Sequence, residues 1–210
     1  MEFYLTYKGQ LRAEGKGGGR SREKQLLRKE FHKQLRELWQ QHPDLRRQAG
    51  SKFIREPNRG RILVAHDGQP EAKTWVEHIA DDHQKCGGRF VPLVSKVGGF
   101  TCSLEILFLR RDNPGHIIAS GGDIDNRIKV LFDGLRMPDT ETELGGLPLD
   151  SDENPFYCLL EDDSLITNVS VKTDRLISPL NLGEKIHDVF LLIHVTMVNP
   201  SAIFVGNRLV

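Results

Sequence analysis

The sequence predicts a single α/β domain over residues 1–210, in which a mixed β-sheet packs against helices. Three observations favour this class. Two long segments carry apolar residues at helical spacing, several shorter apolar runs read as strands, and 210 residues suit one domain with an insertion. A chain of this length can bury a sizeable core, so it needs no disulfide or zinc to fold.

Two segments are expected to form the helices that pack on the sheet. Residues 22–41 follow Ser21, a candidate N-cap, and end at His42-Pro43. Residues 123–137 form the second helix. Their apolar stripes are Leu27, Phe31, Leu35 and Leu38 in the first helix, and Ile124, Ile128, Leu131 and Leu135 in the second.

Five strands complete the predicted sheet, near residues 2–7, 89–97, 101–110, 165–173 and 188–198. Gly98-Gly99 indicates a hairpin between the second and third of these strands. The last run is almost wholly apolar, which predicts a buried central strand.

Two segments fall outside this core pattern. Residues 43–95 are interpreted as an insertion, irregular over 43–69 apart from the short apolar run 62–65, with a helix over 70–85. Residues 138–160 are expected to form a long acidic loop. From residue 138 to residue 163 there are nine Asp or Glu and no Lys or Arg.

The net charge of zero conceals two strongly polarised parts. Residues 1–62 hold 16 Lys or Arg against 7 Asp or Glu, whereas residues 63–210 hold 13 against 22. This asymmetry favours a basic surface for a polyanion and a separate acidic site. The alternative from charge alone is a solvated charged helix beside an acidic loop.

Composition excludes several classes of protein. The three cysteines are scattered without CxxC spacing, so a disulfide framework or a cysteine-rich zinc module is not expected. The start of the chain lacks a signal-peptide pattern, and no apolar run is long enough to span a bilayer. We therefore expect a cytoplasmic protein with no membrane contact.

A glycine-rich segment at residues 8–20 and the helix after it carry ten of the 16 Lys and Arg residues of the basic part at 1–62. The segment is neither a Walker loop nor a dinucleotide fingerprint. Its bases favour phosphate contact, although a plain flexible loop explains the glycines equally well. The candidate DNA-binding residues are Lys8, Arg12, Lys16, Arg20, Arg22, Lys29, Lys33 and Arg36.

The start of the second helix carries the chemistry-bearing residues. Asp123 and Asp125 stand at its beginning, and Asp125, Lys129 and Asp133 share one face at four-residue spacing. Acidic residues in a first helical turn are also common for electrostatic reasons, stabilising the helix by about 0.3–1 kcal/mol. A lone pair of aspartates would therefore favour the helix-electrostatics interpretation.

A second acidic cluster shifts the balance towards a metal site. Glu161-Asp162-Asp163 stands just before the strand-like run that begins at residue 165. Carboxylates from separate segments are hard oxygen ligands suited to Mg²⁺ or Mn²⁺. Such a set, with a nearby lysine, is what a metal-dependent phosphodiester hydrolase requires.

The segment at 123–135 resembles a specific family motif. Asp123-Ile124-Asp125-Asn126-Arg127-Ile128-Lys129, continuing to Phe132-Asp133-Gly134-Leu135, is similar to the D-x-D-N-x-x-K…(F/L)-D-x-L signature of RusA-type Holliday junction resolvases. These crossover junction endodeoxyribonucleases are small, phage-derived or bacterial, and act as Mg²⁺-dependent homodimers. Asp162-Asp163-Ser164-Leu165-Ile166 resembles the family's third acidic segment.

The resemblance implies a role for each matching residue. Asp123, Asp125 and Asp163 would be metal ligands for Mg²⁺, with Mn²⁺ as a substitute, and Lys129 would lie near the scissile phosphate. Asn126 and Asp133 would be supporting residues. The resemblance covers about half of the chain, and residues 43–95 and 138–160 depart from the family pattern. The third ligand stays open, because Glu161, Asp162, Asp150 and Asp152 compete with Asp163.

The implied function is paired hydrolysis of phosphodiester bonds in branched DNA, above all four-way junctions, during recombination and repair. A C2 homodimer would place two identical sites on a substrate with approximate two-fold symmetry. The alternative is a non-catalytic protein of the same fold that binds branched DNA. A further alternative is a domain in which the 123–133 pattern is only helix electrostatics.

Overall fold

The main sheet of the protein has four strands in the order β1-β10-β7-β9. In the computed structural model the described residues are 1–210 except 14–19, 57–61, 66–68, 111–123, 178–187 and 200–210. β1 and β7 run antiparallel to β10 on its two sides, and β9 runs parallel to β7. The strands are β1 (Glu2–Gln10), β7 (Thr101–Arg110), β9 (Ile166–Arg175) and β10 (Asp188–Val198). The mixed α/β class and the central position of β10 are therefore confirmed.

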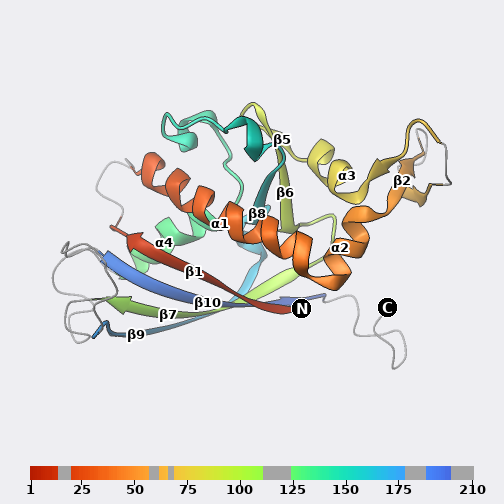
Figure 1. Cartoon of the computed structure of the whole chain (residues 1–210). Coiled ribbons are helices and arrows are strands. Elements are labelled where there is room, and N and C mark those ends of the chain that lie inside the picture. Colours follow the sequence, from red (N-terminus) through yellow and green to blue (C-terminus); the bar gives the residue numbers. More distant parts are fainter. Residues whose placement is uncertain (14–19, 57–61, 66–68, 111–123, 178–187, 200–210) are drawn as a thin grey trace, which may run out of the picture.

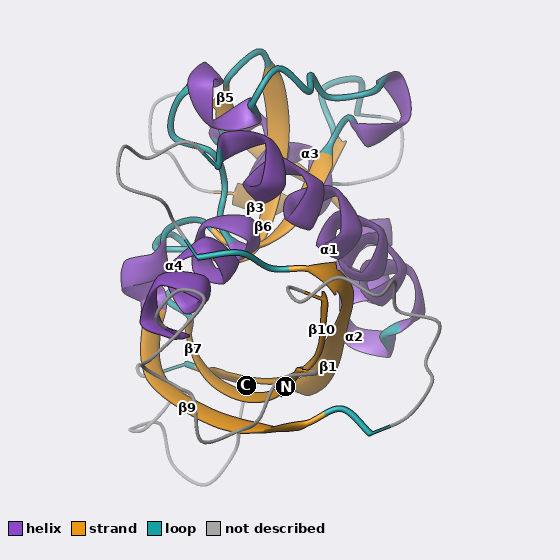
Figure 2. Ribbon diagram, turned by 90° about the vertical axis from the view of Figure 1, so that its left-hand side faces the viewer, coloured by secondary structure: helices purple, strands orange, loops and turns teal. Residues whose placement is uncertain are grey.

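Two helices cover one face of this sheet. α1 (Ser21–Gln41) and α4 (Ile124–Leu135) lie on the same side of it and pack against each other (Figures 1 and 2). Alternate residues of β10, from Val189 to Val195, are buried beneath them. The predicted α1 stripe is confirmed at its first three positions, and Trp39 is the fully packed residue of the last turn rather than Leu38. Ser21 is the first helical residue and not the N-cap, which is Arg20.

Gly134 allows the two helices to approach closely. A Cβ built at this position would lie 2.7 Å from the Cβ of Leu27, closer than real side chains pack. Glycine inside a helix costs about 1 kcal/mol relative to alanine. The close crossing of α1 and α4 explains why glycine is nevertheless present here.

Residues 43–87 contain more regular structure than the sequence indicates. Short strands β3-β2-β4 form a separate sheet, and the helix expected over 70–85 is confined to α3. It begins where Thr74 and Glu77 form a capping box, which satisfies the first free backbone N–H groups. The elements are α2 (Pro43–Gly50), β2 (Lys52–Arg55), β3 (Ile62–Val64), β4 (Lys73–Thr74), α3 (Trp75–Asp82) and β5 (Gln84–Lys85).

The predicted hairpin at Gly98-Gly99 is wrong. β6 (Gly88–Val94) does not pair with β7 but runs parallel to β8 (Phe156–Leu160), in a third sheet ordered β5-β6-β8. β8 lies inside the segment expected to be an acidic loop. The rest of that segment holds two short 3₁₀ helices, η1 (Glu141–Leu144) and η2 (Ser151–Glu153).

α1 is shared by these layers. It contacts α4, β1 and β8, so it lies between the four-stranded sheet and the β5-β6-β8 sheet (Figure 2). None of the helices in the described ranges is long and apolar enough to cross a membrane.

Candidate metal and phosphate site

Asp125 and Lys129 are exposed on successive turns of α4. The Asp125 carboxylate accepts a hydrogen bond of 2.9 Å from the backbone N–H of Asn126. Lys129 makes no hydrogen bond or ion pair with any described residue, and it does not reach Asp125 within 4 Å. The i,i+4 pair that helix electrostatics would favour is therefore not formed. Asp123 lies outside the described residues.

The second acidic cluster lies beside α4. It leads into a short 3₁₀ helix, η3 (Asp163–Leu165), which packs against α4. Leu165 and Ile124 both pack on the same hydrophobic core. The topology thus brings Asp163 and the helix that carries Asp125 and Lys129 together, although 38 residues separate the two aspartates in the sequence.

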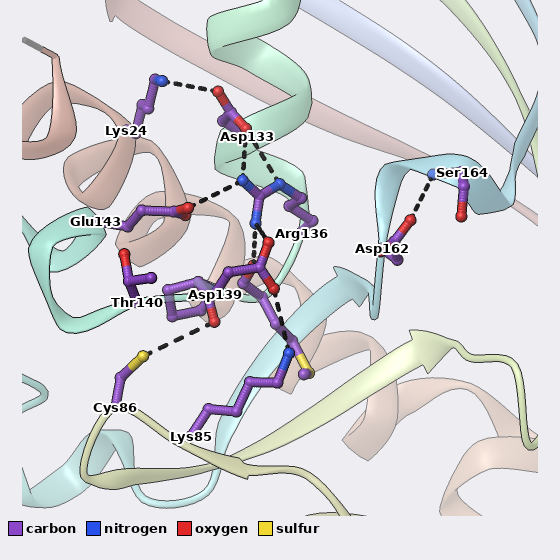
Figure 3. Close-up of polar contacts among 12 residues, drawn as sticks. Lys24, Lys85, Cys86, Asp133, Arg136, Asp139, Thr140, Glu143, Asp162 and Ser164 are labelled. Atoms are coloured by element: carbon purple, nitrogen blue, oxygen red, sulfur yellow. Dashed lines mark hydrogen bonds and ion pairs between the residues drawn. The ribbon is translucent and has the colours of Figure 1, made fainter. Parts of the chain in front are cut away.

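The three acids of this cluster have different surroundings. Glu161 accepts a hydrogen bond of 2.8 Å from the backbone N–H of Lys96, and Asp162 accepts one of 2.9 Å from the backbone N–H of Ser164 (Figure 3). Hydrogen bonds from the Ser164 hydroxyl and backbone N–H lower the pKa of Asp162. The exposed Asp163 carboxylate has no hydrogen-bond or ion-pair partner among the described residues. Of the three, Asp163 has the carboxylate most available to an external cation.

Asp133 belongs to a structural network instead of the open face of α4. Its carboxylate pairs with Lys24 Nζ at 2.8 Å and with Arg136 Nη2 at 2.9 Å. Figure 3 shows Arg136 at the centre of this network, which also includes Asp139 and Glu143. Burial opposes the charge of Arg136, but the surrounding carboxylates, Glu143 foremost, raise its pKa overall. Asp133 therefore joins α4 to α1 and to the acidic segment.

Arg28 anchors the acidic segment to α1 from within the protein. Its guanidinium is buried and donates to the Glu143 carboxylate at 2.8 Å, the Glu143 carbonyl at 3.0 Å and the Arg136 carbonyl at 3.1 Å. Burial lowers the pKa of Arg28, with Glu143 opposing that effect. A buried charge requires partners of this kind. Sequence reasoning missed Arg28, although its i,i+3 spacing to Phe31 already placed it beside the buried stripe.

The acidic segment also contacts Lys29 and Arg36, two partly buried bases of α1. Lys29 Nζ lies 2.7 Å from Asp150 and 2.8 Å from Glu153, and Arg36 donates to the Asp152 carbonyl at 3.3 Å. Burial would lower the pKa of Lys29, but its hydrogen bonds to Asp150 and Glu153 raise it overall. The opposite charges of the two halves of the chain therefore meet inside the fold. Asp150 is accordingly engaged with Lys29.

The eight predicted phosphate-binding residues fall into three groups. Arg12 and Arg20 contact Glu23, Lys33 pairs with Glu30, and Lys29 and Arg36 contact the acidic segment. Lys8 and Arg22 are exposed and have no hydrogen-bond or ion-pair partner in the described parts of the chain. Lys16 lies outside the described residues. The basic surface expected for a polyanion is therefore partly neutralised within the protein, because carboxylates pair with Arg12, Arg20, Lys29 and Lys33.

Asp125 and Asp163 suit a hard divalent cation by their chemistry, since both are exposed carboxylates that no basic side chain of the described chain neutralises. Within the described ranges no three His, Cys, Asp or Glu side chains form a metal-binding group, and the predicted set includes Asp123, which those ranges omit. No protein-family model, curated protein or solved structure matches this chain.

Proposed function

We propose that the protein is a Mg²⁺-dependent endodeoxyribonuclease of the RusA type that cleaves branched DNA. The observation that carries the proposal is the juxtaposition of α4 and η3. Together they present Asp125, Lys129 and Asp163 as exposed side chains that form no ion pair with any other residue of the described ranges. In a structure where many other charged side chains are paired, these three remain available for external partners.

Asp125 and Asp163, with Asp123, would hold the magnesium ion. When bound, the ion would supply a polarised water for attack on phosphorus and stabilise charge on the leaving oxygen. Lys129 would place its ammonium group against the phosphate oxygens as negative charge develops there. The Asn126 N–H restricts the orientation of the Asp125 carboxylate. Lys8 and Arg22, two candidate bases with no ion-pair partner in the part of the chain that the structure describes, would contact the DNA backbone without reading sequence.

The substrate class follows from the resemblance of residues 123–135 and 162–166 to the resolvase motifs. Four-way junctions have approximate two-fold symmetry, so a homodimer with one site per subunit could nick two strands in a pair. Such cleavage would serve DNA recombination and repair.

The proposal is tested with a synthetic four-way junction, labelled on each strand in turn, incubated with the protein and Mg²⁺. We expect symmetric nicks from the wild type and none from Asp125→Asn. Asp174→Asn is the matched control, because Asp174 is also exposed and its carboxylate also accepts a hydrogen bond from the next backbone N–H, at 2.7 Å. Equal cleavage by wild type and Asp125→Asn would refute the proposal. Junction binding without cleavage in either Mg²⁺ or Mn²⁺ would instead identify a non-catalytic branched-DNA-binding protein.

A further inference from the structure

The outermost strand of the main sheet, β9, is open along one edge and on both faces. It pairs with β7 on one side, and no strand of the described residues pairs with its other side (Figure 1). Every residue from Thr167 to Lys172 is exposed. Parallel strands normally lie in sheets whose two faces are covered. An exposed parallel strand with an open edge therefore indicates a partner that binds there.

The helices that cover the main sheet leave β9 uncovered. Val169 and Val171 point to the helix-covered face, because they stand beside Leu104 and Ile106 of β7 in the register. Leu104 and Ile106 are 0% and 2% exposed, whereas Val169 and Val171 are 40% and 38% exposed. The two valines thus form an apolar strip along the open edge.

The centre of β9 lacks the features that usually protect an edge strand. Natural edge strands carry proline, bulges or charged side chains that prevent pairing with another chain. β9 has a register shift near its start, opposite Cys102 and Ser103, and charged residues from Lys172 onward. Between them, residues 168–171 (Asn-Val-Ser-Val) have no charge and no proline. The edge is therefore protected at its ends and open to strand pairing at its centre.

This centre is complementary to a second copy of itself. In an antiparallel pair with a two-fold axis at Ser170, Val169 lies opposite the other copy's Val171, and Asn168 lies opposite the other copy's Lys172. β-branched residues opposite each other stabilise a sheet, whereas like charges opposite each other destabilise it. This register places no like charges opposite each other over residues 166–174. An axis at Lys172 would instead bring the two Lys172 side chains together.

We propose that the protein forms a homodimer in which β9 of one subunit pairs antiparallel with β9 of the other, centred on Ser170. The two four-stranded sheets then form one continuous sheet. The two-fold axis is perpendicular to this sheet, so α1 and α4 of both subunits lie on the same side of it. Both proposed metal sites then lie on that side as well. This last consequence rests on the proposed nuclease function, whereas the strand pairing itself is independent of it.

Disulfide cross-linking tests the register directly. Residues directly opposite each other in an antiparallel pair have Cα atoms about 4.5–5.5 Å apart, which a disulfide can bridge. Ser170→Cys should therefore form a cross-linked dimer under mild oxidation. Lys172→Cys is the matched control, since its two copies would lie about 13 Å apart along the strands, too far for a disulfide. Both variants also carry Cys86→Ser, because Cys86 is only partly buried.

Sedimentation velocity without DNA or metal measures the association. We expect a wild-type dimer with a Kd of about 1–100 µM, since a single strand junction is a small interface. Val171→Lys places an ammonium group among the paired valines and should raise the Kd about tenfold or more. Val64→Lys is the control, because Val64 is an exposed valine of β3, and should leave the Kd unchanged. Circular dichroism verifies that each variant is folded.

Three results would overturn the proposal. The first is a wild type that remains monomeric at about 500 µM. The second is a Val171→Lys variant that dimerises as tightly as the wild type. The third is a Ser170→Cys variant that cross-links no better than Lys172→Cys.

Cleavage of a supercoiled plasmid that extrudes a four-way junction connects the dimer to the proposed function. Paired nicks by a dimer would linearise the plasmid, whereas single nicks would give open circles. Val171→Lys should shift the product from linear to open-circular, and Val64→Lys should not. No cleavage by the wild type would refute the nuclease proposal alone, because sedimentation and cross-linking test the dimer without DNA.

Discussion

The buried guanidinium of Arg28 donates a 2.8 Å hydrogen bond to the carboxylate of Glu143, a residue 115 positions further along the chain. Arg28 belongs to the basic half of the sequence and Glu143 to the acidic half. Their contact shows that opposite charges from the two halves of the sequence pair with each other inside the folded protein. The acidic segment is thus an intramolecular partner of α1.

Removal of Glu143 should strongly destabilise the protein. Glu143→Ala leaves the Arg28 charge buried with neutral acceptors only, two backbone carbonyls and Gln25 Oε1 at 3.3 Å, for which we expect a loss of about 3 kcal/mol in the free energy of unfolding. Urea denaturation at neutral pH measures it. Lys33→Ala breaks only the exposed pair with Glu30 and should change stability by less than about 1 kcal/mol. Similar losses for both variants would contradict the structural role given to Arg28.

We expect His32 to make the free energy of unfolding depend on pH between about pH 6.5 and pH 4. Burial, followed by the charge of Arg36, lowers the pKa of His32 to about 4. Its Nδ1 accepts a 2.8 Å hydrogen bond from the Tyr157 N–H, and its ring stacks on Phe156. The unfolded chain takes up a proton near pH 6.5 while the folded chain does not until about pH 4. The contribution of neutral His32 to the free energy of unfolding is therefore complete above pH 6.5. It decreases as the pH falls towards 4, by roughly 3 kcal/mol at most.

The measurement is urea unfolding of wild type and His32→Gln at several pH values between 7 and 4.5. His32→Gln should be less stable at pH 7 but should lose less stability on acidification, because glutamine does not titrate. His194→Gln serves as the control and should retain the wild-type dependence. A wild-type protein whose stability is constant between pH 6.5 and 4.5 would show that His32 is not held neutral by the fold.

Asp163 and Asp162 should respond differently to the same substitution. If the proposed site is correct, Asp163→Asn removes a metal ligand and should lower the cleavage rate about a thousandfold, equivalent to several kcal/mol of transition-state stabilisation. Asp162→Asn keeps a side-chain oxygen that can accept the Ser164 N–H, because Asn and Asp are about equally good N-caps, so it should leave cleavage nearly unchanged and alter stability by less than about 1 kcal/mol. Junction cleavage and thermal unfolding of both variants, with and without Mn²⁺, distinguish the two roles. The reverse pattern would assign the ligand to Asp162.

The basic residues of the N-terminal half should differ in their contribution to DNA binding, according to whether a carboxylate of the protein already pairs with them. If branched DNA is the partner, Arg22→Ala and Lys8→Ala should each weaken binding and reduce the slope of log K against log salt by about one. Lys29→Ala should leave that slope nearly unchanged, because Asp150 and Glu153 already neutralise this side chain. Fluorescence anisotropy with a labelled junction at several salt concentrations measures the slopes. A reduction of the slope by Lys29→Ala equal to that by Arg22→Ala would show that the acidic segment moves away from α1 when DNA binds.

Much of the local structure could be predicted from short stretches of sequence. The stripes of α1 and α4, the alternation in β7 and the apolar run of β10 all indicate the observed element. β8 was missed, although Phe156 to Leu160 form an apolar run that follows Pro155. Acidic residues stand on both sides of this run, at 150–153 and 161–163, so the segment as a whole resembles a charged loop.

Two properties could not be predicted from short stretches: which strands pair with each other, and which charged side chains form ion pairs within the protein. The turn signal at Gly98-Gly99 is real, since Gly99 has a positive φ of 66°, but the strands on its two sides join different sheets. Likewise, the spacing of Asp125, Lys129 and Asp133 places them on one helix face, yet only Asp133 is engaged by Lys24 and Arg136.

The sequence by itself determined where the helices and main strands form and where Asp125, Lys129 and Asp163 stand relative to them, because hydrophobic periodicity and capping act over a few residues. Only the tertiary structure decided that β6 pairs with β8, that η3 packs beside α4, and that carboxylates of residues 143–153 pair with Arg28 and Lys29 of α1. These outcomes depend on contacts between residues that are tens to more than a hundred positions apart. Which charges remain available for an external partner is therefore a property of the packed molecule.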